Sequence, residues 1–474
     1  MNERRNERTN HSPSTSAPDL SAPGTAALHP QPDFAALHAE HLSTIRAYFD
    51  RALAESGHRA VIVHSGVLEP IFRDDQHYPF KAHAWFKAWV PLTAVEDCFL
   101  DYEPGRVPAL LFHRPTDYWY KAADLPQAFW TPHVDLKPVR DRVEARAALP
   151  GDLSTTAYIG GAFTELAAWN VAAVNPAALL TRIDYHRARK TDYELACLRA
   201  ANRSAARGHL AAARSFAGGA SELEIEHAFL GACGAREQEL PYNPIVALNE
   251  NGAVLHYQML ERTPPSALHS MLIDAGTEAG GYASDVTRTY SHHDADFASL
   301  IERFDELQQS LCTSVRAGID WRDVHLSAHR LVAELLHESD IISCDAEEAV
   351  ATGVSSVFLP HGVGHLLGLQ VHDAGGLLRC AEGGEIPRPQ GHPSLRLTRV
   401  LEPGFVVTME PGIYFIDPLL AQARADHRAG KINWLRVASL QRFGGIRIED
   451  DLAIGETGAE NITRDAFAAE ARAA

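Results

Sequence analysis

The segment PHGVGHLLGLQVHD, residues 360–373, is the most distinctive stretch of this chain. It contains His361, His365 and His372, interleaved with three glycines, within fourteen residues. Isolated histidines are usually surface residues or hydrogen-bonded core residues. Glycine lets a backbone approach another group closely, so histidines interleaved with glycine are much less often structural. The segment therefore predicts a binding or catalytic site.

Two aspartates lie upstream of this segment in positions that also indicate a site. Asp274 ends the apolar run SMLID, residues 270–274, and Asp285 follows a glycine-rich turn. If these two segments pair as a hairpin, the carboxylates face each other, and they repel unless a cation lies between them. An unpaired buried carboxylate is also costly. The alternative is that one aspartate caps a turn and the other pairs with Arg288.

Two glutamates follow downstream on strand-like runs. Glu410 ends the run VVTM, residues 406–409, and Glu449 lies in GIRIED, residues 445–450. The period-two alternation of a strand puts Arg447 and Glu449 on one face and the isoleucines on the other. The glutamates are therefore expected to join the aspartates and the histidine segment.

Four carboxylates and one imidazole make an oxygen-rich ligand set. Such a set suits Mn²⁺, and also Co²⁺ or Zn²⁺, better than it suits a metal that prefers thiolates. Four negative charges balance two divalent cations, which two-metal hydrolases hold about 3.5–4 Å apart. The sequence therefore predicts a hydrolase with two metal ions and a bridging hydroxide as its nucleophile.

The order of these residues resembles that of the pita-bread metallopeptidases. This family includes methionine aminopeptidases, Xaa-Pro aminopeptidases and Xaa-Pro dipeptidases (prolidases). The likeness runs from about residue 34 to residue 466 and is strongest to bacterial Xaa-Pro dipeptidases and to the related organophosphorus acid anhydrolases. Further stretches that carry it are HSG (64–66), YPFK (78–81), IVALNEN (245–251), EPGIYF (410–415) and FGGIRIED (443–450).

The resemblance implies a dinuclear, Mn²⁺-preferring centre with the ligands Asp274, Asp285, His365, Glu410 and Glu449. It also implies three catalytic residues. His372 would stabilise the tetrahedral intermediate, His256 would lie near the scissile carbonyl, and Glu410 would pass a proton to the leaving proline nitrogen. The alternative for His256 is a buried histidine bonded to backbone.

The resemblance further implies a set of substrate-binding residues: His361, Arg447, Arg396, Tyr242, Val371, Trp119 and Asp75. Arg396 would bind the free carboxylate of a dipeptide as a bidentate pair. Its alternative, a solvated or structurally paired arginine, is our interpretation of Arg399. Trp119 would reach the site from the small domain, either of the same subunit or of a partner subunit, and its alternative is ordinary packing. Trp321 stands where relatives carry a tyrosine, which leaves the pocket width open.

At 474 residues the chain exceeds the usual size of one domain. We expect a mixed α/β protein with a disordered tail at 1–33, a small N-terminal α/β domain at 34–185 and a pita-bread catalytic domain at 186–474. Predicted strands are 60–63, 109–112 and 157–159, and predicted helices are 34–56, 163–174, 189–215, 221–237, 296–316 and 323–338.

Composition excludes several other classes of protein. The formal charge of −18 argues against nucleic-acid or anionic-membrane partners. Six cysteines far apart in sequence, with no CxxC pair, indicate reduced thiols in a cytoplasmic protein. The chain has no run of apolar residues long enough to span a bilayer and no secretory signal. A homodimer is implied by the resemblance of the small domain alone.

The function expected from these features is metal-dependent hydrolysis of dipeptides with proline in the second position. The Xaa-Pro bond has no N–H, so a pocket shaped for the ring is needed where other proteases use a hydrogen bond. One alternative is phosphotriester hydrolysis, as a main or side activity. Another is a non-catalytic binding module, which the five filled ligand positions argue against.

Overall fold

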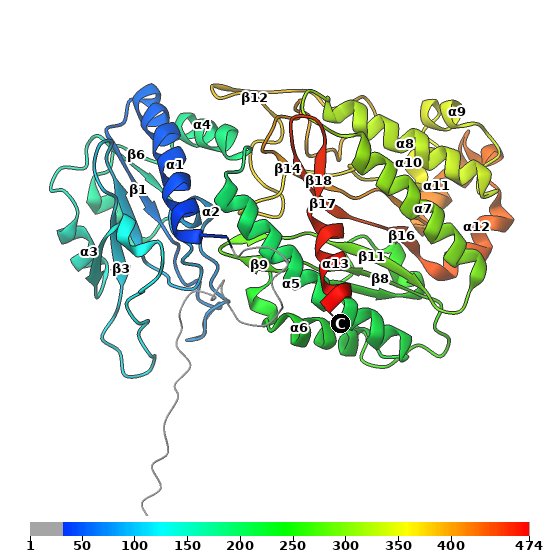
Figure 1. Cartoon of the computed structure of the whole chain (residues 1–474), viewed down its shortest axis with the longest axis horizontal. Helices are drawn as coiled ribbons and strands as arrows, with labels where there is room; N and C mark the ends of the chain where they lie inside the picture. Colours follow the sequence, from blue (N-terminus) through cyan, green and yellow to red (C-terminus); the bar gives the residue numbers. More distant parts are fainter. Residues whose placement is uncertain (1–31, 474) are drawn as a thin grey trace, which may run out of the picture. The chain divides into compact units, whose positions relative to one another are not determined.

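A computed structural model of the chain describes residues 32–473 (Figure 1). These residues form two compact units: unit 1 holds residues 57–175, and unit 2 holds residues 32–56 and 176–473. The predicted disordered tail falls, apart from its last two residues, outside the described part of the chain. The domain boundaries given above stay predictions.

Unit 1 is built on a six-stranded mixed sheet with the order β4-β3-β2-β1-β5-β6. The strands are β1 Ala60–His64, β2 Phe99–Tyr102, β3 Ala109–His113, β4 Asp135–Val139, β5 Thr156–Ile159 and β6 Ala173–Val174. β1 runs antiparallel to β2 and parallel to β5. The short helices are α2 Ala84–Lys87, α3 Arg142–Ala148 and the 3-10 turn η1 Thr131–His133. All three strands predicted for this region are confirmed.

The helix predicted over residues 163–174 is wrong in its length and type. The structure has a 3-10 helix, η2 Thr164–Trp169, followed by strand β6. Asn170 adopts a left-handed conformation, with φ of 54°, which ends the helical turns. Leu166 and Trp169 still reach the apolar core of the unit, so the apolar spacing reflected burial and not a long helix.

The first helix, α1 Phe34–Ser56, is confirmed. Leu42, Ile45 and Phe49 are buried along one face, and Gly57 follows the helix with φ of +75°. The helix packs on α4 Ala177–Arg187 and α5 Asp192–Ala217, which places it in unit 2 although the chain enters unit 1 directly after it.

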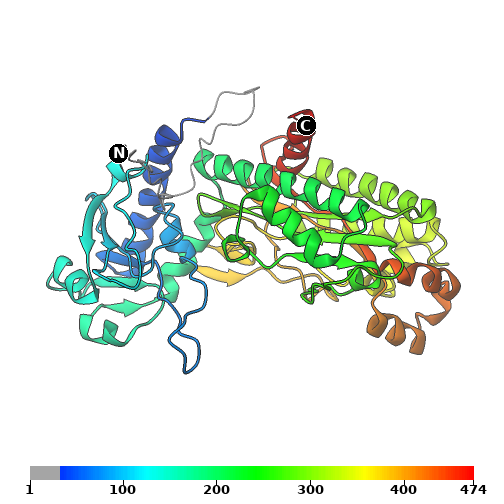
Figure 2. The same cartoon turned by 90° about the horizontal axis from the view of Figure 1, so that it is seen from below.

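The long helices of unit 2 are α5, α6 Glu222–Cys233, α7 Ala295–Ser314 and α8 Trp321–Glu338, and they confirm the four predicted there. α5 and α6 each start at a capping box, Thr191 with Glu194 and Ser221 with Glu224. In Figure 2 these helices lie along the outer side of the strands. None of the helices within residues 32–473 is long and apolar enough to cross a membrane.

The strands of unit 2 form small sheets. One has the order β11-β8-β7, with β7 Ile245–Leu248, β8 Ser270–Asp274 and β11 Thr287–Ser291. A second has the order β14-β17-β18, with β14 Val406–Met409, β17 Asp450–Ile454 and β18 Ala459–Asn461, and β15 Gly412–Tyr414 pairs with β16 Gly445–Arg447. An isolated bridge between Thr287 and Glu449 joins β11 to the segment between β16 and β17.

The shorter elements complete unit 2. They are β9 Glu278–Ala279, β10 Tyr282–Ala283, β12 Leu378–Cys380, β13 Gly383–Glu385, α9 Ala346–Ala351, α10 Ser355–Phe358, α11 Asp417–Ala425, α12 Trp434–Leu440 and α13 Ile462–Ala473. The 3-10 helices of the unit are η3 Glu237–Glu239, η4 Asn249–Ala253, η5 Ala429–Lys431 and η6 Gln441–Phe443.

Candidate metal centre

Asp274 and Asp285 are brought together by a strand pair. β8 and β11 run antiparallel, with Thr287 opposite Asp274, as the sequence predicts for these segments. Gly276 allows their approach, because a Cβ there would lie 1.9 Å from the Ser284 carbonyl oxygen. Asp274 ends β8, and Asp285 comes two residues before β11, so both carboxylates belong to one end of the pair.

The alternative pairing of these aspartates with Arg288 is wrong. Arg288 Nη2 donates to Asp450 Oδ1 at 2.7 Å, and its Nη1 donates to the carbonyl oxygens of Thr287 and Glu449. Asp274 instead accepts hydrogen bonds from Arg447 Nη2 and from Tyr242 Oη, both at 2.8 Å. Arg288 therefore bonds to Asp450 and to backbone carbonyl groups, and it pairs with neither Asp274 nor Asp285.

His365 is held against the second sheet with its ring facing the carboxylates. Its Nδ1 donates to the Leu366 carbonyl oxygen at 3.0 Å, which orients the ring with Nε2 toward the carboxylates. That Nε2 atom is 3.5 Å from Asp285 Oδ2 and 3.5 Å from Glu410 Oε1. Glu410 directly follows β14, the strand on which the His365 segment packs.

Glu449 adds the last carboxylate of the group, from the segment between β16 and β17. Asp285, His365 and Glu449 each offer a ligand atom, and these atoms lie within 4.8 Å of one another. The alternation expected here holds: the two neighbouring isoleucines are buried in the apolar core, while Arg447 and Glu449 face the site. The structure thus brings the five predicted ligand side chains to one place.

The electrostatics of the group indicate that it lacks a positive charge. Burial raises the pKa of Glu449 well above its usual value, and the charges of Asp285 and Glu410 raise it further. Burial also raises the pKa of Asp274 and brings that of Glu410 to about 7. Burial opposes the charge on His365, but the carboxylates of Asp285 and Glu410 outweigh it and raise the His365 pKa to about 9. Divalent cations would satisfy all of these groups.

One unpaired atom supports the same conclusion. Thr287 Oγ1 donates to Glu449 Oε2 at 2.8 Å, whereas Glu449 Oε1 is buried and has no hydrogen-bond partner within the described part of the chain. Buried carboxylate oxygens are normally paired. A metal ion fits this oxygen and the donor set around it, so the carboxylates and His365 are candidate metal-binding groups.

Two polar residues that the sequence analysis did not single out connect the charged groups. Thr287 Oγ1 also accepts from Arg447 Nε at 3.1 Å. Tyr414 Oη lies 3.0 Å from Arg447 Nη1 and 2.8 Å from His361 Nε2. The strand alternation from Asp285 to Thr287 was a signal for the threonine, whereas the contacts of Tyr414 depend on tertiary packing.

The candidate catalytic histidines surround this centre. The ring centroids of His365 and His372 are 4.5 Å apart. Desolvation, followed by the charges of His365 and Arg396, lowers the pKa of His372 to about 4. Burial and the charge of Arg447 lower the pKa of His361 to about 4. Both imidazoles are therefore neutral near pH 7. His361 Nδ1 donates to the Gly362 carbonyl oxygen and its Nε2 accepts from Tyr414 Oη, so of the two only His372 can donate to a ligand.

His256 lies close enough to act electrostatically on both His361 and His372. Its side chain is exposed, so the alternative of a buried histidine bonded to backbone is wrong. Val371 precedes His372 and is half-buried.

The two arginines near residue 400 differ as the sequence analysis expected. Arg399 is buried, packs on the rings of Tyr185 and Phe405 at 4.0 and 4.7 Å, and donates to Glu402. Arg396 is exposed, and its charge acts on His372. Arg399 is therefore a structural residue, while Arg396 is free to meet a ligand.

The remaining aromatic and acidic residues named in the sequence analysis are Asp75, Trp119 and Trp321. Asp75 and Trp119 belong to unit 1, where both are exposed, Trp119 by 76%. Trp321 is fully buried, and a Cβ on Gly364 would lie 2.9 Å from its ring. Trp321 therefore packs behind the segment that carries His365.

Comparison with known proteins agrees with this site. Residues 36–185 match the Xaa-Pro dipeptidase N-terminal domain, and residues 196–456 match metallopeptidase family M24. The sequence is 46% identical to the Xaa-Pro dipeptidase of Xanthomonas axonopodis pv. citri, over 93% of this chain and 100% of that protein. It is also 46% identical to the Xaa-Pro dipeptidase of Stenotrophomonas maltophilia, over 93% of this chain and 99% of that protein.

Solved structures show the same fold. Aminopeptidase P from E. coli with the inhibitor Pro-Leu superposes with a TM-score of 0.67 at 23% identity, covering 90% of this chain and 98% of that one. An aminopeptidase of Pseudomonas aeruginosa gives a TM-score of 0.67 at 21% identity, covering 92% and 98%. The N-terminal α/β domain and the pita-bread domain predicted from the sequence are confirmed.

A buried group of carboxylates and one imidazole on a pita-bread fold defines a metallopeptidase. The chain belongs to metallopeptidase family M24. The two relatives named above, which match 93% of this chain, are Xaa-Pro dipeptidases, in agreement with the resemblance noted in the sequence.

Proposed function

We infer that this chain hydrolyses Xaa-Pro dipeptides as an M24 metallopeptidase. The observation that carries this inference is the convergence of four carboxylates and His365 in a chain that matches Xaa-Pro dipeptidases over 93% of its length. No serine or cysteine nucleophile is required, because the acidic centre can hold divalent cations.

The proposed metal ligands are Asp274, Asp285, His365, Glu410 and Glu449, and the proposed cofactor is a pair of Mn²⁺ ions, with Co²⁺ or Zn²⁺ as alternatives. The unpaired Glu449 Oε1 and the raised carboxylate pKa values support two cations, because a single divalent charge leaves four buried carboxylates half neutralised. When bound, such ions supply a polarised carbonyl and an activated water.

Side chains around the centre can transfer protons and stabilise the negative charge that develops during the reaction. Glu410, as a carboxylate at the centre, can accept a proton and pass it to the proline nitrogen as that nitrogen leaves. Neutral His372 can donate a hydrogen bond to the carbonyl oxygen as negative charge develops on it. His361, whose two ring nitrogens are bonded to Gly362 and Tyr414, is proposed to line the pocket. His256 lies beside both and is proposed to line the same region.

Recognition of a dipeptide requires a group that binds its free carboxylate. Arg396 is proposed for this role, because it is exposed and adjacent to His372. Tyr242 and Arg447 are proposed to orient Asp274, which both of them bond, and Val371 to contact the substrate. The proposed roles of Asp75 and Trp119, a homodimer and a cytoplasmic location rest on the resemblance and composition alone.

Removal of metal tests the cofactor. Chelation and dialysis should abolish Ala-Pro hydrolysis, and addition of Mn²⁺ should restore it in proportion to the metal bound, up to about two equivalents. Elemental analysis of the same samples gives the stoichiometry, and circular dichroism of the chelated protein shows that it is still folded. Full activity in protein with less than about a tenth of an equivalent of metal would contradict the proposal.

Substrate length tests Arg396. Ala-Pro should be cleaved and Ala-Pro-Ala should not, because the tripeptide has no carboxylate at the position of the proline. Arg396→Ala should lower kcat/KM for Ala-Pro by about 10- to 100-fold, with partial recovery in Arg396→Lys. Arg379→Ala, on the exposed strand β12, is the matched control. Equal turnover of both peptides would make the enzyme an aminopeptidase. A phosphotriester assayed in parallel measures the predicted side activity.

A further inference from the structure

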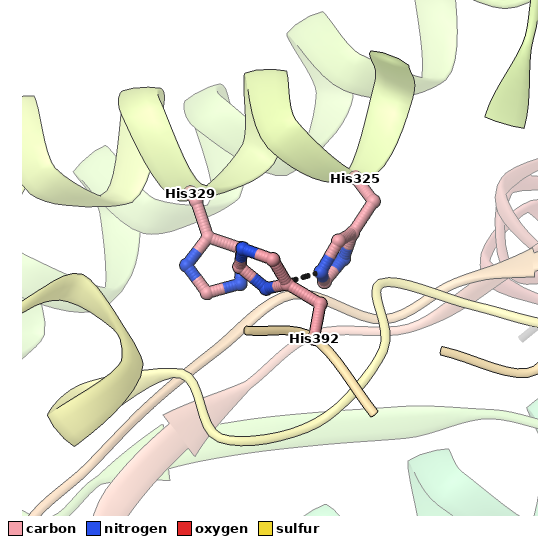
Figure 3. Close-up of side chains that lie close together, drawn as sticks. All are labelled: His325, His329 and His392. Atoms are coloured by element: carbon pink, nitrogen blue, oxygen red, sulfur yellow. Dashed lines mark hydrogen bonds between the residues drawn. The ribbon is translucent and has the colours of Figure 1, made fainter. Parts of the chain in front are cut away.

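A second group of histidines shares no residue with the carboxylate centre, although His361 acts electrostatically on two of its members. His325 and His329 are one turn apart on α8, on the face of the helix that is buried. His392 comes from the loop between β13 and β14 and points toward them (Figure 3). The three rings face one another, and each offers a nitrogen within 4.8 Å of the other two.

The rings pack edge to face at nearly equal distances. The centroids of His325 and His329 are 4.7 Å apart, those of His325 and His392 are 4.6 Å apart, and those of His329 and His392 are 4.5 Å apart. An i, i+4 pair of histidines on one helix face, completed by a third from a loop, is a common way to form a three-nitrogen site.

The hydrogen bonds leave nitrogens in the group without partners. His329 Nδ1 lies 3.0 Å from Ser355 Oγ, which leaves its Nε2 for a ligand. His325 Nε2 and His392 Nδ1 are 2.9 Å apart and share one proton (Figure 3). His329 Nε2 and His325 Nδ1 are buried and have no hydrogen-bond partner among residues 32–473, and both side chains are only 1% exposed.

The group is a poor fit to an ordinary structural role. A histidine kept in a core for packing normally pairs both ring nitrogens, because an unpaired buried polar atom costs free energy. Burial and the neighbouring histidines also keep the rings uncharged, lowering the pKa of His325 to about 2 and that of His329 to about 3. Uncharged imidazoles have a lone pair available to a metal.

We propose that His325, His329 and His392 bind one transition-metal ion, of the Zn²⁺, Co²⁺, Ni²⁺ or Cu²⁺ class, at a site separate from the carboxylate centre. Imidazole nitrogens suit these ions, whereas the carboxylate centre has the oxygen-rich set that suits Mn²⁺. Tetrahedral ligand nitrogens at 2.0–2.1 Å from a zinc ion are about 3.3 Å apart, so small ring movements suffice. A fourth position is left for water.

The bound ion would join a loop to a helix. His392 is half-buried, which gives the ion a route from solvent. The loop also has bonds of its own, such as those from Arg388 Nε to the Leu395 carbonyl oxygen at 2.6 Å and from the Trp321 amide to the Arg399 carbonyl oxygen at 3.2 Å. Arg396 lies four residues after His392 on this segment. The ion therefore fixes the segment that carries the proposed carboxylate-binding arginine to α8.

Metal uptake by the Mn²⁺-loaded enzyme tests the proposal. The wild-type enzyme, His392→Ala and the control His427→Ala, which removes an exposed histidine from a different loop, are each dialysed against Zn²⁺ and analysed for both metals. The wild type and the control should bind about one equivalent of Zn²⁺ more than His392→Ala does. Exchange at the carboxylate centre affects all three proteins equally and cancels in this difference.

A spectroscopic arm identifies the ligands. Cu²⁺ added to the Mn²⁺-loaded wild type should give an electron paramagnetic resonance signal with nitrogen hyperfine structure that is lost in His392→Ala and in His325→Gln. Circular dichroism shows that each variant is folded, and His392→Gln replaces His392→Ala if the latter is not. Equal Zn²⁺ uptake by the wild type and the folded His392 variant, or an unchanged Cu²⁺ signal, would overturn the proposal.

Discussion

The hydroxyl group of Thr287 makes hydrogen bonds to two charged side chains. Its Oγ1 donates to Glu449 Oε2 at 2.8 Å and accepts from Arg447 Nε at 3.1 Å. Arg447 in turn donates to Asp274 at 2.8 Å. Groups that orient a metal ligand contribute to affinity because they fix the ligand before the ion arrives. This hydroxyl therefore acts on two of the proposed ligands without touching an ion.

Substitution of Thr287 tests whether its hydroxyl orients the proposed metal ligands, because it leaves the charge of the site unchanged. Thr287→Val keeps the shape of the side chain and removes the hydroxyl, so it should weaken Mn²⁺ binding and lower kcat/KM by about 10- to 100-fold. Thr287→Ser keeps the hydroxyl and should stay close to wild type. Mn²⁺ titration calorimetry on the metal-free proteins measures the effect, and an unchanged Kd in Thr287→Val would contradict it.

The segment around His365 acts as an additional strand beside β14. The Thr408 amide donates to the His365 carbonyl oxygen at 3.0 Å, and the Glu410 amide donates to that of Val363 at 2.9 Å. This register puts His365 next to Glu410. Gly364 permits it, because a Cβ at that position would lie 2.1 Å from the Thr408 carbonyl oxygen. Gly364 thus lets the His365 segment approach β14 closely, and this approach brings His365 near the other proposed ligands.

A matched pair of glycine substitutions tests this contact. Gly364→Ala should separate the His365 segment from β14, lower the melting temperature by several degrees and reduce metal content, because the new methyl group has no space. Gly231→Ala, within α6 and with open space around it, should raise stability by up to about 1 kcal/mol through helix propensity. Thermal unfolding compares them, and an equal response of both variants would show that Gly364 is not under steric constraint.

Local patterns predicted the elements well and the contacts between distant segments poorly. The apolar spacing of α1 and the alternation through Arg447 and Glu449 were sufficient, because each depends on neighbours in sequence. The bond from Asn202 Nδ2 to Asp451 Oδ2, at 2.7 Å behind the site, joins residues 249 positions apart, and no local pattern indicates it. The helix predicted over residues 163–174 was wrong because buried apolar residues also occur at helical spacing in a 3-10 helix.

Acid sensitivity of the whole molecule can be traced in part to His209. Its Nε2–H donates to the Ala275 carbonyl oxygen at 2.9 Å, so it ties α5 to the end of β8. Burial lowers the pKa of His209 to about 3, whereas an unfolded histidine has a pKa of about 6.5. Its contribution to stability is therefore complete above pH 6.5 and is lost as the pH falls toward 3, since only the unfolded chain takes up the proton.

His209→Gln keeps an N–H donor but cannot titrate. Between pH 6.5 and 4 the unfolding free energy of this variant should depend on pH less steeply than that of the wild type, by about 1.4 kcal/mol per pH unit. Urea unfolding of metal-free protein at several pH values measures the slopes. His337→Gln, at an exposed position of α8, should keep the wild-type slope. Identical slopes for the His209 variant and the wild type would refute the assignment.

In the described part of the chain, residues 57–175, which form unit 1, interrupt the sequence of unit 2. The chain leaves unit 2 after Ser56 and returns at Pro176. Helices α1 and α4 flank the excursion and pack on each other, and Arg182 Nε donates to Glu55 Oε2 at 2.9 Å. The two helices that flank residues 57–175 are thus held together within unit 2. We therefore expect that a short flexible linker in place of residues 57–175 would leave the packing of α1 on α4 intact.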